Sequence, residues 1–254
     1  MEQTDTILLA GLLRSDVPTL ISTCDKYLRN LYKESTVYSC DEYIFAVGDI
    51  PILLVAHLDT VWFKAPIILV TEDKAIWTGK NGLGADDRAG VFAILKLIQQ
   101  NKHKPYVLFT TDEEMGGIGA YVFSKDFPAP PENLKYIIEI DRRGQGQSVF
   151  YNCKNKEFED YVNSFGFTTH EGIFSDISFI CPTWNIAGVN LSAGYYNEHT
   201  PYEYLKIKDL YYTIDKIQEM LNDADNAKNY IYLKESNNNG KRKYRKEQRR
   251  TKNY

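Results

Sequence analysis

Acidic and histidine side chains follow four apolar, strand-like runs of the sequence, each at the point where the run ends. They are His57 and Asp59 after residues 52–56, Glu113 and Glu114 after 107–111, Asp141 after 136–140, and His199 after 190–192. A fifth acidic group, Asp86 and Asp87, opens a segment with helical spacing. Imidazole and carboxylate groups that gather in one place can bind a divalent cation or transfer protons as general acids and bases.

The elements that would position these groups alternate along the chain. Runs of β-branched and aromatic residues predict strands at 43–47, 52–56, 67–70, 75–78, 106–111, 136–140, 148–151 and 186–191. Apolar residues at helical spacing predict helices at 16–31, 89–99, 118–123, 156–164 and 206–221. This alternation predicts an α/β fold, a single three-layer α/β/α domain with a mostly parallel sheet. Ligands bind beyond the carboxyl ends of such strands, so we expect the acidic and histidine groups to converge there.

Convergence of these groups has an electrostatic consequence. Four or more carboxylates in one crevice repel one another unless a cation lies among them. Two histidines and three carboxylates form a nitrogen and oxygen donor set that suits zinc, and also cobalt or manganese. Five protein ligands exceed the four of one tetrahedral zinc, and a carboxylate can bridge two ions. We therefore predict two divalent metal ions about 3.5–4 Å apart, as in two-metal hydrolases.

Five segments resemble, in order, the metal motifs of the co-catalytic zinc exopeptidases. That clan contains peptidase T-like enzymes, bacterial leucine aminopeptidases and zinc carboxypeptidase-like deacylases. The segments are His57-Leu-Asp59-Thr, Gly84-Ala-Asp86-Asp87-Arg-Ala-Gly, Thr111-Asp-Glu113-Glu114-Met-Gly-Gly, Ile140-Asp141 and Asn197-Glu-His199-Thr. One such motif is weak evidence, whereas five in the same order are specific.

The resemblance implies a metal-binding role for five side chains. Asp86, the first acid of its pair, matches the carboxylate that bridges the two ions. His57 and Asp141 match the remaining ligands of one ion, and Glu114 and His199 match those of the other.

The resemblance also implies two roles beside the metal ions. Glu113 matches the general base, and Asp59 matches the acid that orients His57. A metal-bound histidine usually donates its other N–H to a carboxylate, which agrees with the role of Asp59. Adjacent residues at a strand end point in different directions, so Glu113 can face the water while Glu114 binds metal. We expect Asp87 to be structural.

Five further residues are candidates for contact with the substrate. The planar guanidinium of Arg142 or Arg143 could bind a substrate carboxylate, with charge balance beside an acidic site as the alternative. Ser175, Asp176 and Tyr195 lie in the stretch before the last motif. They could line the substrate pocket or pack within a buried loop.

The spacing of the last two motifs bears on domain organisation. Only 57 residues separate Asp141 from His199, too few for the lid or dimerisation domain that larger relatives often carry there. We expect a catalytic domain at residues 1–233 without a separate lid. Residues 240–254 contain eight Lys or Arg residues and one acid, so we predict a basic, disordered tail at 234–254. Weak, salt-sensitive binding of nucleic acid is the functional alternative for this tail.

Composition excludes several classes of protein. Apolar residues make up 43% of the 254, and no apolar run reaches the ~18 residues of a membrane span. The four cysteines include no Cys-x-x-Cys pair, and the acidic start is unlike a secretory signal, so we expect a reduced cytoplasmic protein. No Gly-x-Gly-x-x-Gly follows a strand, and a nucleotide cofactor is unsupported.

These observations favour a metal-dependent hydrolase of short peptides, most simply an aminopeptidase-like exopeptidase. An N-acyl amino acid deacylase could use the same residues with a different pocket. From another class, an inactive hydrolase fold could serve as a binding module with a basic arm. The sequence leaves open which end of a peptide is recognised, the resident metal and the oligomeric state.

Overall fold

The computed structural model describes residues 2–73 and 75–234 of the chain. In this part the helices are α1 (Gln3–Arg14), α2 (Val17–Leu31), α3 (Ala85–Gln100), α4 (Ile118–Asp126), α5 (Lys156–Ser164), α6 (Ile177–Trp184) and α7 (Ile207–Asn222), with a 3₁₀ turn at Glu34–Thr36. The strands are β1 (Val37–Ser39), β2 (Tyr43–Ala46), β3 (Ile50–His57), β4 (Ile67–Val70), β5 (Ile76–Lys80), β6 (Pro105–Thr110), β7 (Tyr136–Arg142), β8 (Gln147–Val149), β9 (Thr168–His170), β10 (Gly188–Ser192), β11 (Tyr195–Tyr196) and β12 (Tyr204–Lys206). No helix in the described ranges is long and apolar enough to cross a membrane.

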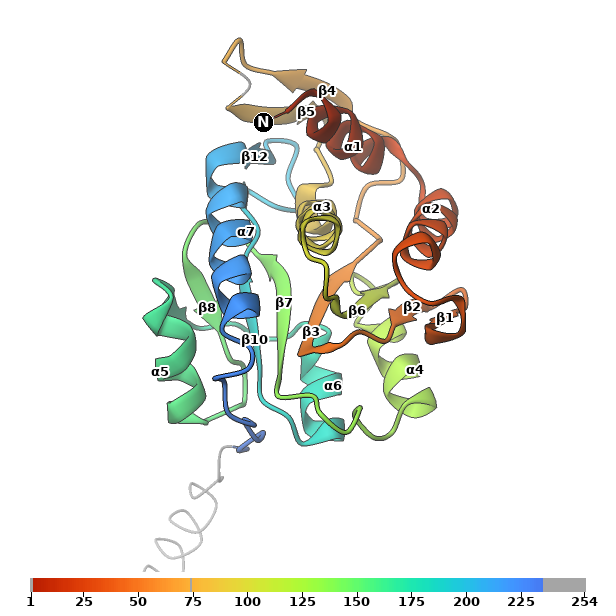
Figure 1. Ribbon diagram of the computed structural model, residues 1–254. Helices are drawn as coiled ribbons and strands as arrows, with labels where there is room; N and C mark the ends of the chain where they lie inside the picture. The colour runs from red at the N-terminus through yellow and green to blue at the C-terminus, as the bar shows by residue number, and fades with distance from the viewer. Residues whose placement is uncertain (1, 74, 235–254) are drawn as a thin grey trace, which may run out of the picture.

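Within the described residues, a large sheet has the strand order β1-β2-β6-β3-β7-β10-β8-β9 (Figure 1). Its four central strands, β6, β3, β7 and β10, run parallel, and Leu54 of β3 pairs with Val107 on one side and Ile138 on the other. Strands β2 and β8 join antiparallel at the two sides of this central group. The carboxyl ends of the four central strands therefore share one edge, as the alternation of elements predicts.

Alternate residues of the central strands feed two separate hydrophobic cores. Leu54, Val107 and Ile138 belong to the core covered by α1, α2, α3, α5 and α7. Their neighbours Leu53 and Leu108 belong to the core covered by α4 and α6. Both faces of each strand are buried, which explains why these strands are continuous apolar runs rather than alternating ones. The three-layer α/β/α arrangement is confirmed.

Helix α3 lies at the centre of the larger core, and nearly all of its residues are buried. Asp86 and Asp87 have non-helical φ and ψ angles, so regular helix begins at Arg88, close to the expected start at Ala89. The peptide bond between Asp86 and Asp87 is cis. In this irregular first turn the consecutive charged side chains of Asp86, Asp87 and Arg88 point in three different directions.

The structure contains two helices that helical spacing does not reveal. Helix α1 buries Leu9, Leu12 and Leu13 against the core but leaves Ile7 66% exposed, so its apolar residues form no clean stripe. Helix α6 has eight residues and contains Pro182, which breaks the helical pattern. Apart from α1 and α6, the helices of the described residues lie where the sequence predicts them.

Strands β4 and β5 form at the expected positions, but they lie outside the large sheet. Together with β11 and β12 they make an antiparallel sheet of order β11-β12-β5-β4 in the described residues, beside α1 in Figure 1. Because β12 pairs with β5, this second sheet ties the segment after His199 to the segment before α3. The sequence predicts the mostly parallel central sheet but does not reveal this second, antiparallel sheet.

The segment between Asp141 and His199 contains β8, α5, β9, α6, β10 and β11. Strands β8, β9 and β10 belong to the large sheet, α5 and α6 contribute to its two cores, and β11 belongs to the second sheet. The basic tail expected at 234–254 lies, apart from Lys234, outside the described residues.

Candidate metal centre

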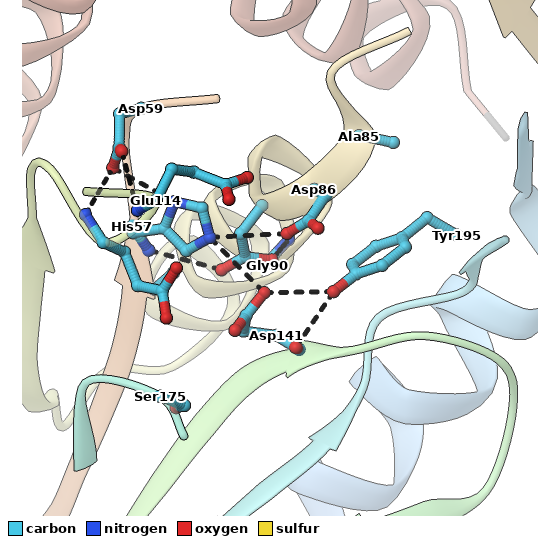
Figure 2. Close-up of polar contacts among 12 residues, drawn as sticks. His57, Asp59, Ala85, Asp86, Gly90, Glu114, Asp141, Ser175 and Tyr195 are labelled. Atoms are coloured by element: carbon cyan, nitrogen blue, oxygen red, sulfur yellow. Dashed lines mark hydrogen bonds and ion pairs between the residues drawn. The ribbon is translucent and has the colours of Figure 1, made fainter. Parts of the chain in front are cut away.

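Two neighbouring parallel strands and the first turn of α3 bring together the first cluster of donor atoms. His57 is the last residue of β3, and Asp141 is near the end of β7. The His57 Nε2 atom lies 3.4 Å from Asp86 Oδ1 and 3.4 Å from Asp141 Oδ1 (Figure 2). These three side chains offer donor atoms within 4.8 Å of one another.

A second cluster uses the other oxygen of the same aspartate. The His199 Nε2 atom lies 3.1 Å from Asp86 Oδ2 and 2.9 Å from Glu114 Oε1. Asp86, Glu114 and His199 also offer donor atoms within 4.8 Å of one another. Two clusters of nitrogen and oxygen donors that share one carboxylate fit a pair of divalent cations with Asp86 between them.

The electrostatics of this cluster agree with that fit. Burial and the charge of Asp86 raise the pKa of Asp141 to about 7. The hydrogen bonds to Asp86 and Glu114 raise the pKa of His199 to about 10. Burial lowers the pKa of His57, but its bonds to Asp141, Asp59 and Asp86 outweigh burial and hold that pKa well above its usual range. In the free protein these groups therefore retain protons, which a pair of cations would displace.

Asp59 connects the histidine to the loop that carries the two glutamates. Its Oδ1 atom lies 3.2 Å from His57 Nδ1 and accepts a 3.1 Å hydrogen bond from the Glu113 backbone N–H. Its Oδ2 atom accepts a 3.1 Å bond from the Glu114 N–H. One buried carboxylate thus orients the imidazole and fixes the backbone of both glutamates.

The two adjacent glutamates occupy different places. Glu114 belongs to the second cluster, whereas Glu113 lines the same pocket without belonging to either cluster. Burial raises the pKa of Glu113, the charge of His57 opposes this, and the charges of Asp141 and Asp176 add to it, so that the pKa lies at about 9. The Glu113 carboxyl group thus lies beside the two donor clusters but is not one of their donors.

Asp87 is directed away from the two clusters. Its side chain is fully buried and accepts hydrogen bonds from the backbone N–H groups of His57, at 3.3 Å, and Gly90, at 3.1 Å. Asp87 thereby joins the end of β3 to the first turn of α3. This placement fits the structural role expected for it.

The family model for peptidase family M28 matches residues 46–178 of this chain. The chain belongs to peptidase family M28. It is thus a metallopeptidase, and the expected kinship with the zinc exopeptidases is confirmed. The matched range contains four of the five candidate ligands, His57, Asp86, Glu114 and Asp141, and ends before His199. No curated protein matches the chain.

Solved structures of several peptidases share its fold. A tripeptidase of Staphylococcus aureus superposes with a TM-score of 0.70 at 15% identity, over 89% of this chain and 99% of that one. A TET aminopeptidase of a Thaumarchaeota archaeon gives 0.67 at 13% identity, over 87% and 97% of the two chains. The aminopeptidase PepT of Bacillus cereus gives 0.63 at 13% identity, with the same coverage of 87% and 97%. At these identities the likeness concerns the fold, and it confirms the α/β class.

The candidate substrate residues of this M28 peptidase fall into two groups. Arg142, Arg143 and Tyr195 line a pocket of about 160 Å³ together with the metal-centre residues. Arg142 Nε donates to Gln147, Arg143 pairs with Glu198 at 2.8 Å, and the Tyr195 hydroxyl contacts the Asp141 carboxylate at 3.0 Å. Both arginines therefore already have partners in the protein.

Ser175 and Asp176 lie beneath the pocket of this M28 peptidase rather than along its wall. Both are buried; the Ser175 hydroxyl donates to Glu139, and the Thr110 hydroxyl donates to Asp176. Burial raises the pKa of Asp176 to about 6. These residues occupy the position of packing and positioning groups, which is the alternative that the sequence left open.

Two buried acids near the M28 centre were not predicted from the sequence. Glu203 accepts four backbone hydrogen bonds at the start of α3, from residues 83–86, at 2.7–3.1 Å. Glu139 lies in β7 two residues before Asp141 and is fully buried, and its Oε1 atom has no partner in the described part of the chain. In the sequence, Glu139 stands out only as a single acid inside an apolar strand. No local sequence pattern predicts the position of Glu203.

Proposed function

We propose that this M28 peptidase is an aminopeptidase-like exopeptidase that acts on short peptides through two divalent cations. His57 and Asp141 would hold one cation, Glu114 and His199 the other, and Asp86 would bridge them. The observation that carries this proposal is that the two oxygens of Asp86 face two separate donor clusters, at 3.4 Å from His57 and 3.1 Å from His199.

Cations bound at the two clusters, zinc first and cobalt or manganese as alternatives, would lower the pKa of a water molecule and polarise the scissile carbonyl. Glu113 would accept the proton of the attacking water and deliver it to the leaving amine. Positive charge at the clusters offsets the charges of Asp141 and Asp176, so Glu113 would ionise at a lower pH than in the free protein. Asp59 holds the Glu113 backbone in place.

Acidic groups around the small pocket favour recognition of the amino end of a peptide. Glu113, Asp141 and Glu198 line the pocket together with Arg142 and Arg143. Arg143 pairs with Glu198 Oε1, whereas the Glu198 Oε2 atom is buried without a partner among the described residues. An α-ammonium group would find opposite charge there. The names of the solved neighbours, a tripeptidase and two aminopeptidases, support the same choice.

Metal removal followed by a substrate panel tests this function. We expect a chelator to abolish hydrolysis and zinc, cobalt or manganese to restore it, with loss and recovery followed by peptide cleavage in a chromatographic assay. The panel compares a tripeptide with a free amino end, its N-acetylated form, and an N-acyl amino acid. Cleavage of the free tripeptide alone supports an aminopeptidase. Faster cleavage of the N-acyl amino acid would instead identify a deacylase.

A further inference from the structure

A large cavity of the described residues lies beside the two donor clusters and is separate from the small pocket. It has a volume of about 680 Å³, within the range of sites that enclose small organic ligands. Its walls come from the link between α1 and α2, from the loop after β3, and from the start of α3. Glu114 lines both this cavity and the small pocket, so the two spaces meet at the second donor cluster.

A buried arginine lines this cavity without an acidic partner. Arg88 is 5% exposed, and its Nη1 atom donates to the backbone oxygens of Leu12, at 3.2 Å, and Leu13, at 3.1 Å, in the last turn of α1. Its Nε atom has no partner in the described residues, and no ion pair joins its guanidinium to an acid there. Burying a cation without a counter-charge is unfavourable, so this group is suited to receive one.

Two acids that line the cavity and whose charges act on Arg88 are already engaged. Asp16 accepts a hydrogen bond from the Thr19 N–H as the cap of α2, at 2.9 Å. Asp59 uses both oxygens on His57 and the backbone of the glutamate loop. Burial lowers the pKa of Arg88 to about 10, even though the charges of Asp59 and Asp16 oppose that change.

We propose that this cavity, named here the Arg88 cavity, receives the carboxyl-terminal part of a short peptide and that Arg88 binds its free α-carboxylate. The inference rests on the proposed peptidase function and deepens it. The small acidic pocket would hold the amino end, the donor clusters would lie at the scissile bond, and Arg88 would hold the carboxyl end. A planar guanidinium that presents unpaired N–H groups matches a carboxylate in geometry as well as in charge.

The experiment compares a free tripeptide with the same tripeptide carrying a carboxyl-terminal amide, using the full-length, zinc-loaded protein. A charge-assisted hydrogen bond to Arg88 predicts that kcat/KM is about 10- to 100-fold higher for the free acid, mainly through a lower KM. In Arg88→Gln the ratio of kcat/KM for the free acid to kcat/KM for the amide should fall to about one. Arg88→Lys, which keeps the charge but not the planar fork, should retain part of the preference.

Lys96→Met is the matched control. Lys96 binds Asp5 at 2.7 Å and, like Arg88, joins α3 to α1, but it does not line the cavity. If Arg88 acts only by holding α1, both variants should affect acid and amide substrates equally. The proposal expects the acid preference to survive in Lys96→Met and to vanish in Arg88→Gln.

Binding of the free tripeptide and of its amide to zinc-loaded Glu113→Gln, in which turnover is slowed, gives a second readout by calorimetry with Arg88 intact. Tighter binding of the free tripeptide supports the proposal, and equal binding overturns it. A wild-type acid preference near one-fold, or its persistence in Arg88→Gln, also overturns it. A protein that cleaves both peptides equally contradicts only this inference, whereas one that cleaves neither contradicts the proposed function.

Discussion

At the scale of single residues, neighbouring side chains of the same type have different surroundings. Glu114 lies 2.9 Å from His199 within a donor cluster, while Glu113 stands outside both clusters with a pKa raised to about 9, chiefly by burial. Asp86 belongs to both clusters, while Asp87 accepts hydrogen bonds from the backbone N–H groups of His57 and Gly90. Position relative to the strand end and the helix start, rather than residue type, therefore separates the proposed ligand Glu114 from the proposed base Glu113, and the proposed ligand Asp86 from Asp87.

Replacing the proposed base gives the first residue-scale prediction. Glu113→Gln keeps the size of the side chain but removes its ability to accept a proton. We expect peptide hydrolysis to fall by roughly 10²–10⁴-fold while zinc content and melting temperature stay close to wild type. Turnover and metal analysis of the same preparation check this. Near-normal turnover would remove Glu113 from the mechanism.

The sequence predicted the candidate ligands because each lies in a short motif of its own. The structure brings His57, Asp86, Glu114, Asp141 and His199 into two adjoining clusters. Glu203 could not be found in this way, because its backbone partners lie 117–120 residues earlier in the chain. Its role comes from the folded contact alone, and no local pattern of a helix cap points to it.

At the scale of elements, the start of α3 is held by one side chain from a distant loop. The two Glu203 oxygens accept the N–H groups of Leu83, Gly84, Ala85 and Asp86, and Trp62 donates a further bond at 3.0 Å. A carboxylate at a helix N-terminus is favoured by the helix dipole as well as by these hydrogen bonds. Glu203 therefore fixes the backbone from which Asp86 reaches both clusters.

Glu203→Gln tests this element. The amide replaces one accepting oxygen with a donor that faces backbone N–H groups, and several buried bonds are lost. We expect the free energy of unfolding to fall by about 3 kcal/mol, and Tm by roughly 10 °C, in thermal unfolding of the metal-free protein. Glu157→Gln, which removes an exposed ion pair with Lys228, is the control and should change Tm by about 1 °C or less. Equal effects of the two substitutions would contradict the assigned role.

Element prediction succeeded where the pattern is local and failed where it depends on pairing. The parallel strands and the start of regular helix in α3 followed from apolar runs and helical spacing. The second sheet did not, because the partner of β5 is β12, a three-residue strand that lies far along the chain. Helix α1 was not predicted because Ile7 is exposed on the side opposite the buried leucines, so the apolar residues do not form one stripe.

At the scale of the whole molecule, the stability of the metal-free protein is linked to pH through the acids of the centre. Burial raises the pKa of Glu113 to about 9, of Asp141 to about 7 and of Asp176 to about 6. A carboxyl with a higher pKa in the folded state binds its proton more tightly when folded. Stability from these groups is therefore greatest near pH 4 and falls as pH rises towards 9.

Zinc should reverse this dependence, because its ligands bind it in their deprotonated forms. We expect the Tm of the metal-free protein to fall between pH 5 and pH 9. The increase in Tm on adding zinc should be larger at pH 8 than at pH 6. Differential scanning calorimetry at matched ionic strength measures both quantities. If the zinc-dependent increase in Tm does not grow with pH, zinc does not displace protons from these acids.

Because both oxygens of Asp86 are assigned, one to each donor cluster, the clusters are thermodynamically linked. If two ions bind as proposed, the first would neutralise and orient a carboxylate that the second also requires, while its charge would oppose the second. Binding of the two ions would then be a reciprocal, stepwise equilibrium in which the affinity for the second cation differs from that for the first. A calorimetric titration of metal-free protein should require two unequal binding constants.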